Sequence, residues 1–567
     1  MRTAAISWLG WVACVLACVV VAPARAQAPV VLMPNVTYEQ DVEFTPDGPV
    51  AVDVITVPRP GGLYELTSTL AGGTIGGTLE RLTQLESDAA ATATVAGISG
   101  DYFDAKTGYP AGMYMQDHVL AHAGVFGRSS VGIDSSGGLH VARVTFTGYW
   151  RGAGQRRPLN GVNQVPNDGQ VVLFTPAWGQ STPLVANSAE VVLEPFPSVV
   201  PDTELAGTVS AATTGGGTPI PADGAVLMAV GSPGSGLPSF QADASVGSSV
   251  TARVILPSDW SNVVTAIGGG PVLVRASKPV FQANENFSSQ LLTDRSARAG
   301  IGQLADGRII LVAVDGNQPG FSIGMSAYEL AKTMARLGAV TAVALVSGGP
   351  VTAAFDGQLL NRPGSGGQPL KDALLLKYYG VYAPPPTLPL VAKQGAGVVE
   401  LLTYKLVRPS TVTAAVIAPD GVSHVLDSGS RQPGTYSFKW NAFDTEGTWH
   451  WDIKAVDDLG RQSIADQPFQ YDLTLSNLVP STTKTQPGLT VGFALARPAV
   501  VILRIETGRG VVVATAPGVQ LPTGSNQLRW DGTLDGTTKA PPGSYTARVT
   551  AVSAIGTTEL TCRFMLR

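Results

Sequence analysis

The stretch that decides the fold of the first half of the chain is 309–346, IILVAVDGNQPGFSIGMSAYELAKTMARLGAVTAVALV. It begins and ends with apolar runs, Ile309–Val314 and Thr341–Val346, which are typical of strands buried on both faces. Between them, Ser326 and Glu329 have the spacing of a capping box, and Gly338 ends the apolar face that follows. The order strand, helix, strand predicts an α+β domain with a mixed sheet, and a weaker helix is predicted near 79–90.

The composition of the 567 residues excludes several classes of protein. Only 14% of the residues are charged and 44% are hydrophobic, whereas an average soluble protein is roughly 25% charged. Disorder requires low hydrophobicity with high net charge, and nucleic-acid binding requires a basic surface. Neither fits a chain with 37 basic and 42 acidic side chains, so we expect no nucleic-acid partner. The 66 Gly and 41 Pro indicate many short strands joined by turns.

The first residues have the three parts of a secretory signal peptide. Arg2 precedes an apolar stretch, and small residues then offer cleavage after Ala26 or Ala28. We therefore expect residues 1–26 to be removed, and the protein to be secreted or held in a bacterial cell envelope without a membrane span. Of the three cysteines, only Cys562 would then remain, so no internal disulfide is expected.

A proline-rich run and an internal repeat divide the rest of the chain. The run at 383–389 is typical of a stiff spacer. Beyond it, Tyr404–Pro409 recurs as Phe493–Pro498, 89 residues later, with period-two alternation of apolar and polar residues. These patterns predict a first domain at 27–382, a linker at 383–394, and two all-β, Ig-like sandwiches at 395–475 and 476–567.

The second repeat resembles a known module. Trp530–Gly532, followed by Pro541–Tyr545, is similar to the Ig-like repeat of the flagellar hook-capping protein. That resemblance implies a structural or spacing role. Attachment to a surface or a glycan is the alternative, although the aromatic residues occupy strand positions that a sandwich core would use.

Two motifs in the first domain are weak evidence for a metal site and for a serine hydrolase. His118 and His122 are four residues apart, but 113–120 is predicted to be a hairpin, so their spacing does not bring them together on a helix, and no metal site is expected. Gly320–Gly324 matches the G-x-S-x-G elbow of serine hydrolases around Ser322. No His follows Ser322 before the linker, so a serine esterase is a minor hypothesis.

Residues 91–376 resemble the phosphodiester glycosidase domain, the family of the enzyme that uncovers sugar phosphates by removing N-acetylglucosamine. The segments that carry the resemblance occur in the family's order: Ser99–Phe103, Tyr109–Met113, Asn160–Asn163, Pro219–Gly224, Gly268–Pro271, Arg298–Gly316, Gly324–Met325 and Leu360–Pro363. The resemblance implies cleavage of a bond between a sugar and a phosphodiester. It implies a glycan or sugar-phosphodiester substrate and no cofactor.

On this resemblance, Asp101 and Asp315 are the candidate catalytic or orienting carboxyls, and Arg298 is a candidate clamp for the phosphate. The amides near Gly348 and Gly349 are candidates to cradle phosphate oxygens. The remaining candidate substrate-binding residues are Ser99, Gly100, Thr352 and Asn361. Each aspartate could instead cap a glycine turn, and Arg298 could pair with an acid, so structural roles stay open.

The chain departs from the family's pattern at four positions. Val346 and Pro350 replace polar residues in the glycine-rich loop, and Ser99 and Gln368 replace an Asn and an Arg. Two functions therefore remain: an exported hydrolase of sugar phosphodiesters, or a catalytically inactive protein that binds glycan or contributes to surface structure. The sequence does not fix the oligomeric state.

Overall fold

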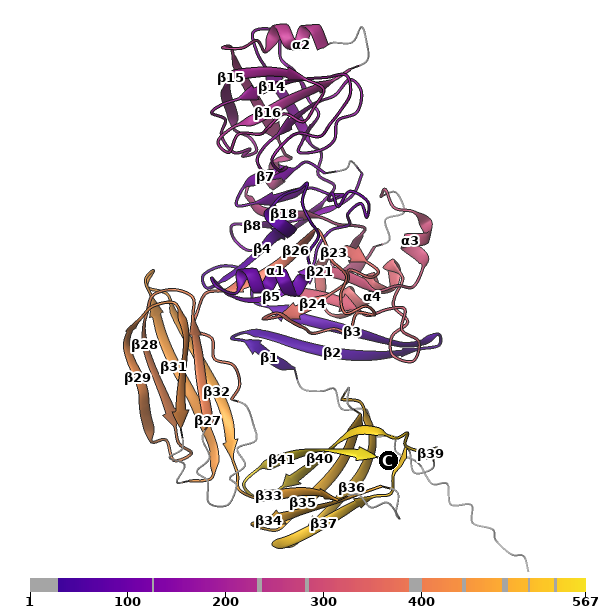
Figure 1. The fold of residues 1–567 in the computed structure, drawn as a ribbon, viewed down its shortest axis with the longest axis vertical. Helices are drawn as coiled ribbons and strands as arrows, with labels where there is room; N and C mark the ends of the chain where they lie inside the picture. The colour runs from indigo at the N-terminus through magenta and orange to yellow at the C-terminus, as the bar shows by residue number, and fades with distance from the viewer. Residues whose placement is uncertain are drawn as a thin grey trace, which may run out of the picture.

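The computed structural model describes residues 29–124, 127–231, 237–280, 285–386, 400–440, 445–481, 488–507, 510–534 and 538–566. The expected signal peptide and most of the expected linker lie outside these ranges. Figure 1 shows an elongated arrangement, with one β-rich unit at the top, the central sheets below it and two sandwiches at the bottom. With 54% of residues in strands and 7% in helices, the protein is mostly β, and the expected α+β class is not confirmed.

The largest central sheet has eight strands, in the order β1-β2-β3-β22-β21-β23-β19-β20. The strands are β1 (Val30–Met33), β2 (Val36–Thr45), β3 (Gly48–Val57), β19 (Val272–Arg275), β20 (Lys278–Pro279), β21 (Arg298–Leu304), β22 (Ile309–Val314) and β23 (Ala339–Ser347). Helix α4 (Ala327–Arg336) connects β22 to β23. Both strands are antiparallel to β21, which lies between them, so the predicted strand–helix–strand unit is present with one strand inserted.

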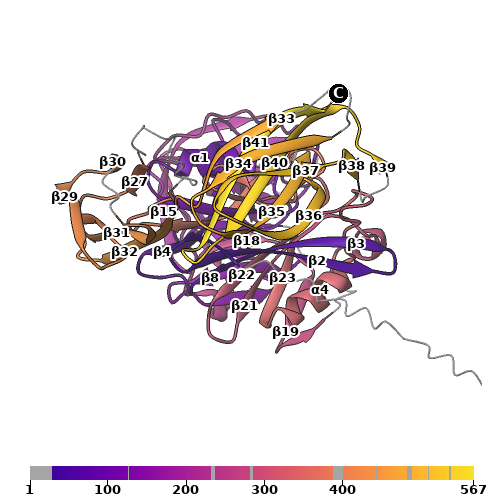
Figure 2. The ribbon, with the colours of Figure 1, turned by 90° about the horizontal axis from the view of Figure 1, so that it is seen from below.

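The sequence of α4 explains its bounds and its packing. Ser326 Oγ accepts a hydrogen bond from Glu329 N at 3.3 Å, and the Glu329 carboxylate accepts one from Ser326 N at 2.8 Å, which confirms the capping box. Gly338 follows with a φ of +92°. The apolar face, including Leu330 and Met334, is buried against the sheet, where Figure 2 shows α4 beside β23 and β19.

Two five-stranded sheets complete the central part. The first has the order β25-β24-β5-β26-β4 and is covered by α1 (Leu82–Ala89), near the predicted weaker helix. Its strands are β4 (Tyr64–Leu70), β5 (Thr94–Ser99), β24 (Ala353–Phe355), β25 (Gln358–Leu359) and β26 (Asp372–Tyr378). The second, β7-β6-β18-β8-β9, comprises β6 (Tyr114–Gln116), β7 (Val119–His122), β8 (Ser130–Asp134), β9 (Leu139–Ala142) and β18 (Val263–Gly268). β6 and β7 form the predicted hairpin.

A separate β-rich unit is inserted between β9 and β18, at the top of Figure 1. Its eight strands are β10 (Thr147–Arg151), β11 (Arg157–Leu159), β12 (Gly161–Val162), β13 (Val171–Phe174), β14 (Ser188–Leu193), β15 (Glu204–Thr214), β16 (Ala225–Val230) and β17 (Ser249–Ile255). Helix α2 (Leu237–Asp243) packs on it through Phe240. The remaining short helices are η1 (Ala71–Gly73), η2 (Ser258–Trp260) and α3 (Ser289–Thr293). The core of the inserted unit is continuous with that of the central part, because one buried cluster contains Trp150 and Leu227 of the insert together with Met115 and Leu120 of β6 and β7.

Two β-sandwiches follow, as the internal repeat predicts. The first pairs β27-β30 with β29-β28-β31-β32: β27 (Glu400–Leu406), β28 (Ser410–Ile417), β29 (Ser423–Arg431), β30 (Gly434–Trp440), β31 (Gly447–Asp457) and β32 (Gln462–Tyr471). The second pairs β33-β34-β37 with β36-β35-β40-β41, with β38-β39 as a small ribbon. Its strands are β33 (Leu475–Ser481), β34 (Leu489–Leu495), β35 (Ala499–Thr507), β36 (Val512–Leu521), β37 (Gly524–Trp530), β38 (Thr533–Leu534), β39 (Thr538–Lys539), β40 (Gly543–Val552) and β41 (Thr557–Leu566).

Hydrogen bonds join the first sandwich to its neighbours. Lys405 Nζ donates to Ala93 O at 2.9 Å, and Val381 N donates to Ser463 Oγ at 3.0 Å. Ala383, where the linker was expected to begin, is buried in the core of the sandwich. At the other end, Arg497 forms ion pairs with Glu446 and Asp472. The first sandwich is therefore anchored on both sides.

The packing of α4 yields a stability prediction. Met334 is fully buried, whereas Lys332 on the same helix is exposed. We expect Met334→Ala to reduce the free energy of opening of the sheet beneath α4 by about 2–5 kcal/mol, because the change leaves a cavity. Hydrogen exchange of the β22 and β23 amides measures this quantity. Lys332→Ala is the control, and equal protection in the two variants would contradict the packing described.

Candidate functional site

The candidate site lies where the two central layers meet, at the end of β5. Ser99 in β5 is paired with Ala373 in β26. Just beyond, Gly100 N donates to Asp372 O at 2.9 Å, and Asp101 N donates to Asp372 Oδ1 at 2.6 Å. Gly100 O accepts from Val346 N at 2.8 Å, which ties the same turn to β23 of the large sheet. The Gly100–Asp101 turn is thus fixed from both layers.

Three glycines allow carboxylate oxygens to approach the backbone closely. A Cβ placed on Gly100 would lie 2.2 Å from Asp372 Oδ1, and one on Gly268 would lie 2.2 Å from Asp101 Oδ2. Gly112 N donates to Asp101 Oδ2 at 2.5 Å, and a Cβ on Gly112 would lie 2.6 Å from that oxygen. These positions require glycine because no side chain fits beside the two carboxyls.

Asp101 and Asp372 form a buried carboxyl pair. Both side chains are about 1% exposed. Among the described residues, Asp101 Oδ1 and Asp372 Oδ2 have no hydrogen-bond partner of ordinary geometry. Burial raises the pKa of both carboxyls, and the charge of Asp372 raises the pKa of Asp101 further. Both effects favour a pair that keeps one proton over a pair with two negative charges.

The groups around the pair include cations and a neutral imidazole. The charge of Arg128 lowers the pKa of Asp101. The charge of Lys371, which directly precedes β26, lowers the pKa of Asp372. His122 Nδ1 lies 2.7 Å from Gly112 O, and burial lowers the pKa of His122 to about 4. A neutral His122 thus supports the Gly112 turn. No group of three or more His, Cys, Asp or Glu in the described part of the chain could hold a metal ion.

Tyr102, directly after Asp101, connects two arginines. Its ring centroid lies 5.4 Å from that of Phe287, and Arg128 Cζ lies 5.5 Å from the Tyr102 ring. The charges of Arg298 and Arg128 both lower the pKa of Tyr102, although burial, the larger effect, raises it. The sequence analysis did not select Tyr102, Arg128 or Asp372 as site residues.

Arg298 is at the predicted place, but its Nε and Nη2 atoms already donate to the backbone. Nε donates to Met325 O at 2.9 Å, and Nη2 donates to Leu291 O at 2.6 Å and to Asp294 O at 2.7 Å. The side chain is buried, and burial lowers its pKa. These contacts fix α3 and the start of α4, so its assignment to phosphate remains a prediction.

Asp315 anchors a loop. Its Oδ1 accepts from Asn361 Nδ2 at 2.9 Å, and its Oδ2 accepts from Arg362 N at 2.8 Å. Burial raises the pKa of Asp315. Asn361 Oδ1 in turn accepts from Ala353 N at 2.9 Å, at the start of β24. In this structure both carboxylate oxygens of Asp315 are engaged by the protein, which is what a capping aspartate does.

The other predicted residues connect the turn of Asp101 to the loop that Asp315 holds. Ser99 N donates to Thr352 O at 3.0 Å, Thr352 N donates to Ser99 Oγ at 3.2 Å, and both residues are buried. Gly348 N donates to Ala297 O at 2.9 Å, whereas Gly349 is exposed with the Gln368 side chain close to it. The structure thus gathers the predicted residues at one edge of the sheets, with Gly349 and Gln368 on the outside.

Ser322 is excluded as an accessible nucleophile in this structure. It is fully buried, its hydroxyl donates to Asp315 O at 2.6 Å, and it accepts from Ala51 N at 3.0 Å. An elbow serine must instead project its hydroxyl from the turn. The G-x-S-x-G match is therefore a turn that supports Asp315.

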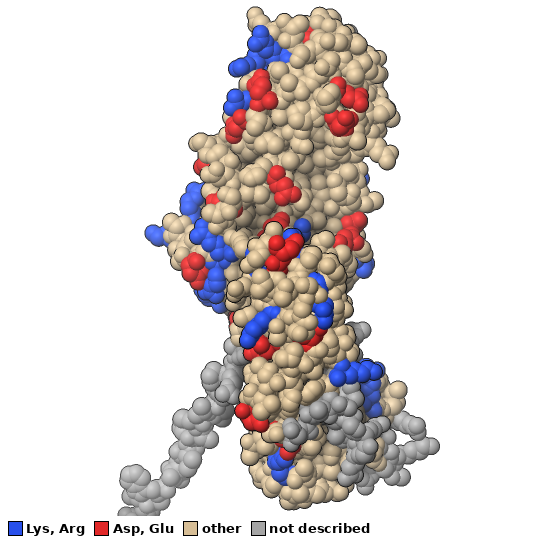
Figure 3. Space-filling view, turned by 90° about the vertical axis from the view of Figure 1, so that its left-hand side faces the viewer, with Lys and Arg blue, Asp and Glu red and all other residues tan. Residues whose placement is uncertain are grey.

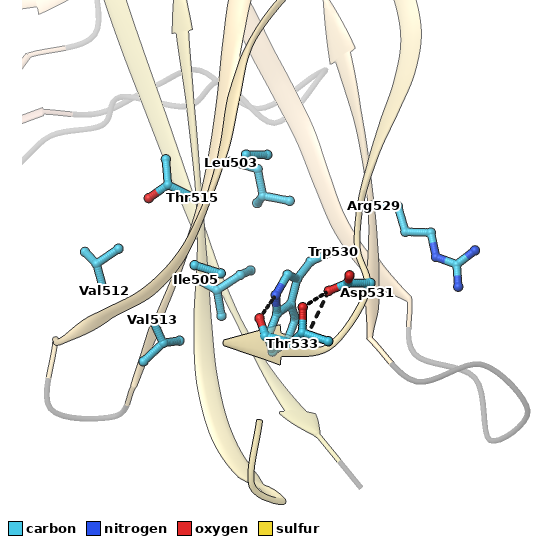
Figure 4. Close-up of a pocket in the computed structure, with 11 residues that line it drawn as sticks. Leu503, Ile505, Val512, Val513, Thr515, Arg529, Trp530, Asp531 and Thr533 are labelled. Carbon is cyan, nitrogen blue, oxygen red and sulfur yellow. Dashed lines mark hydrogen bonds between the residues drawn. The ribbon is translucent and has the colours of Figure 1, made fainter. Parts of the chain in front are cut away.

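A cavity of about 660 Å³ lies far from these residues, in the second sandwich (Figure 4). It is lined by Leu503 and Ile505 on one sheet and by Trp530 on the other. Trp530 Nε1 donates to Thr533 O at 2.9 Å, and Asp531 accepts from Thr533. Polar groups in the lining of the cavity thus form hydrogen bonds with one another. The cavity is the open end of a sandwich core and contains no carboxyl pair.

Two segments of the chain match known protein families, and both families are those that the sequence resembles. Residues 202–377 match the phosphodiester glycosidase family. Residues 476–554 match the FlgD Ig-like domain, which agrees with the resemblance of the second repeat. The glycosidase match contains Arg298, Asp315 and the Gly348 loop, whereas Asp101 precedes it. No curated protein matches the chain.

Solved structures match about three fifths of the chain. A hypothetical protein from Synechocystis is 25% identical, with a TM-score of 0.52, over 62% of this chain and 65% of that one. The chain thus spans just under two thirds of the length of that relative. A putative exported protein from Burkholderia pseudomallei is 21% identical over 59% and 75%, with a TM-score of 0.48. The catalytic domain of zebrafish N-acetylglucosamine-1-phosphodiester alpha-N-acetylglucosaminidase is 16% identical over 62% and 85%, with a TM-score of 0.30.

The phosphodiester-glycosidase-like domain should show a pH-dependent stability to which the carboxyl pair contributes, alongside Asp53 and Glu86, whose pKa values burial also raises. Folding raises the pKa of both carboxyls in the pair, so the pair stabilises the fold fully below the ordinary carboxyl pKa of about 4. That stabilisation is lost as the pH rises through the folded pKa. Asp372→Asn keeps an oxygen that accepts from Asp101 N but carries no charge. We expect its melting temperature to fall less than that of the wild type between about pH 5 and about pH 8.

The control for this experiment is Asp88→Asn, because Asp88 is exposed at the end of α1. Parallel melting curves against pH for Asp372→Asn and the wild type would contradict the proton-holding pair.

Proposed function

We propose that the phosphodiester-glycosidase-like domain hydrolyses the bond between a sugar and a phosphodiester in envelope or extracellular glycans. The observation that carries the proposal is the buried Asp101–Asp372 pair at the edge of a domain with a phosphodiester glycosidase match. A carboxyl that keeps its proton at neutral pH in a closed site is a recurrent feature of acid–base catalysis. The N-terminal signal-peptide pattern supports export.

The proposed reaction breaks the bond between the anomeric carbon and the phosphate oxygen. Water attacks the anomeric carbon, and the phosphate leaves with the bonding electrons as a monoester, so the attacking water must lose a proton. A carboxyl pair that holds one proton has both a donor and an acceptor. The Asp101–Asp372 pair therefore supplies the proton exchange, and the readily departing phosphate needs little protonation. Asp315 orients the Asn361 loop.

The competing function is glycan binding without turnover. One observation favours it: both oxygens of Asp315, and the Nε and Nη2 atoms of Arg298, are already bonded to the protein. The comparisons do not favour it. A turnover assay separates the two functions.

The test uses residues 27–567 and measures sugar release from an N-acetylglucosamine phosphodiester. We expect turnover by the wild type, and a loss of about 10²–10⁴-fold in kcat/KM for Asp101→Asn, the range that general acid–base groups contribute. The control is Asp104→Asn, because Asp104 is exposed three residues away in the same segment. Absence of wild-type turnover on a panel of sugar phosphodiesters would overturn hydrolysis in favour of binding.

A further inference from the structure

Arg128 is held in a defined orientation beside the carboxyl pair. Its guanidinium carbon lies 4.5 Å from the Phe287 ring centroid and 5.5 Å from that of Tyr102. The two rings are themselves 5.4 Å apart and tilted by 54°. Nε donates to Asn286 O at 3.1 Å, which fixes the plane of the guanidinium. Two aromatic faces and a backbone carbonyl thus immobilise a long side chain that is otherwise costly to order.

The charge of Arg128 is not neutralised by an ion pair. Among the described residues, no carboxylate lies within 4.0 Å of its guanidinium nitrogens. Its Nη1 and Nη2 atoms make no hydrogen bond to the described part of the chain. The charge of Arg128 acts on Asp101, whose pKa it lowers. A guanidinium without an ion-pair partner keeps its affinity for an external anion.

The contrast with Arg298 is direct. Arg298 is buried and donates three hydrogen bonds to backbone carbonyls. Arg128 is only half-buried and donates one. Both arginines flank Tyr102. Arg128 therefore presents a free guanidinium edge on the outer side of Tyr102, and Arg298 fixes the protein on the inner side.

We propose that Arg128 is the residue that binds the phosphate of a phosphodiester-linked sugar, with Phe287 as a positioning residue that holds its guanidinium plane. The proposal rests on the proposed function, because it names the anion-binding group of the same site. A planar guanidinium with a free Nη1–Nη2 edge matches the paired oxygens of a phosphate, which a lysine ammonium does not.

The test is a binding measurement that does not depend on turnover. Isothermal titration of residues 27–567 uses N-acetylglucosamine 1-phosphate as the anionic probe and N-acetylglucosamine as the uncharged probe. We expect Arg128→Ala to weaken binding of the anionic probe by about 10-fold or more, because a charge-assisted contact is lost. Arg128→Lys should recover only part of it, and Phe287→Leu should weaken it with the charge unchanged.

The control is Arg308→Ala, because Arg308 is exposed and paired only with Asp306. Its affinity for the anionic probe should equal that of the wild type. Equal affinity in Arg128→Ala, or an equal loss for both probes, would overturn the proposal, as would a wild type that does not bind the anionic probe. Selective binding through Arg128 without turnover of any phosphodiester would leave the proposal standing and reject hydrolysis.

Discussion

The hydrogen bond from Asp101 N to Asp372 Oδ1 is the constraint on which the site depends. It joins the end of β5 to the start of β26, 271 residues later in the chain, at a distance of 2.6 Å. The same contact brings two buried carboxyls together. Gly100 and Gly268 have no side chain because carboxylate oxygens occupy the places where a Cβ would be. The glycine-rich segments around Asp101 are therefore a packing requirement of the pair.

Charge and burial divide the site into an inner and an outer part. Inside, Arg298 and Asp315 satisfy backbone groups and hold the ends of β21, β22 and β24 in place. Outside, Arg128 keeps free donors, and Gly349 and Gln368 are exposed. Across the molecule, Lys and Arg are interspersed with Asp and Glu over wide uncharged areas on the face that Figure 3 shows. None of the helices formed by the described residues is long and apolar enough to cross a membrane.

The sequence predicts the parts of this structure that depend on local pattern. The capping box at Ser326, the buried runs of β22 and β23, and the repeat of the sandwiches all come from residues close together in the chain. The many short strands are predicted from the Gly and Pro content, whereas the α+β class of the first domain is not confirmed, because the clear α4 helix outweighed strands that carry little periodicity each. Asp101, Asp315 and Arg298 were found through the family resemblance, which gave no information on how their polar atoms are used.

Asp372 and Arg128 could not be found in the same way, because their importance comes from contacts between distant segments. Asp372 did carry a signal: a carboxylate at the start of the apolar run Ala373–Leu376 is costly to bury unless it is bonded. The central claim is that the Asp101–Asp372 pair holds a proton. Infrared difference spectroscopy at about pH 7, with carbon-13 in the aspartate carboxyls, tests it directly, since free aspartate is ionised there. The account requires a protonated aspartate carbonyl band in the wild type that is lost in the double variant Asp101→Asn/Asp372→Asn, with the band of any other buried aspartate unchanged. Identical carbonyl bands in the two proteins would contradict it.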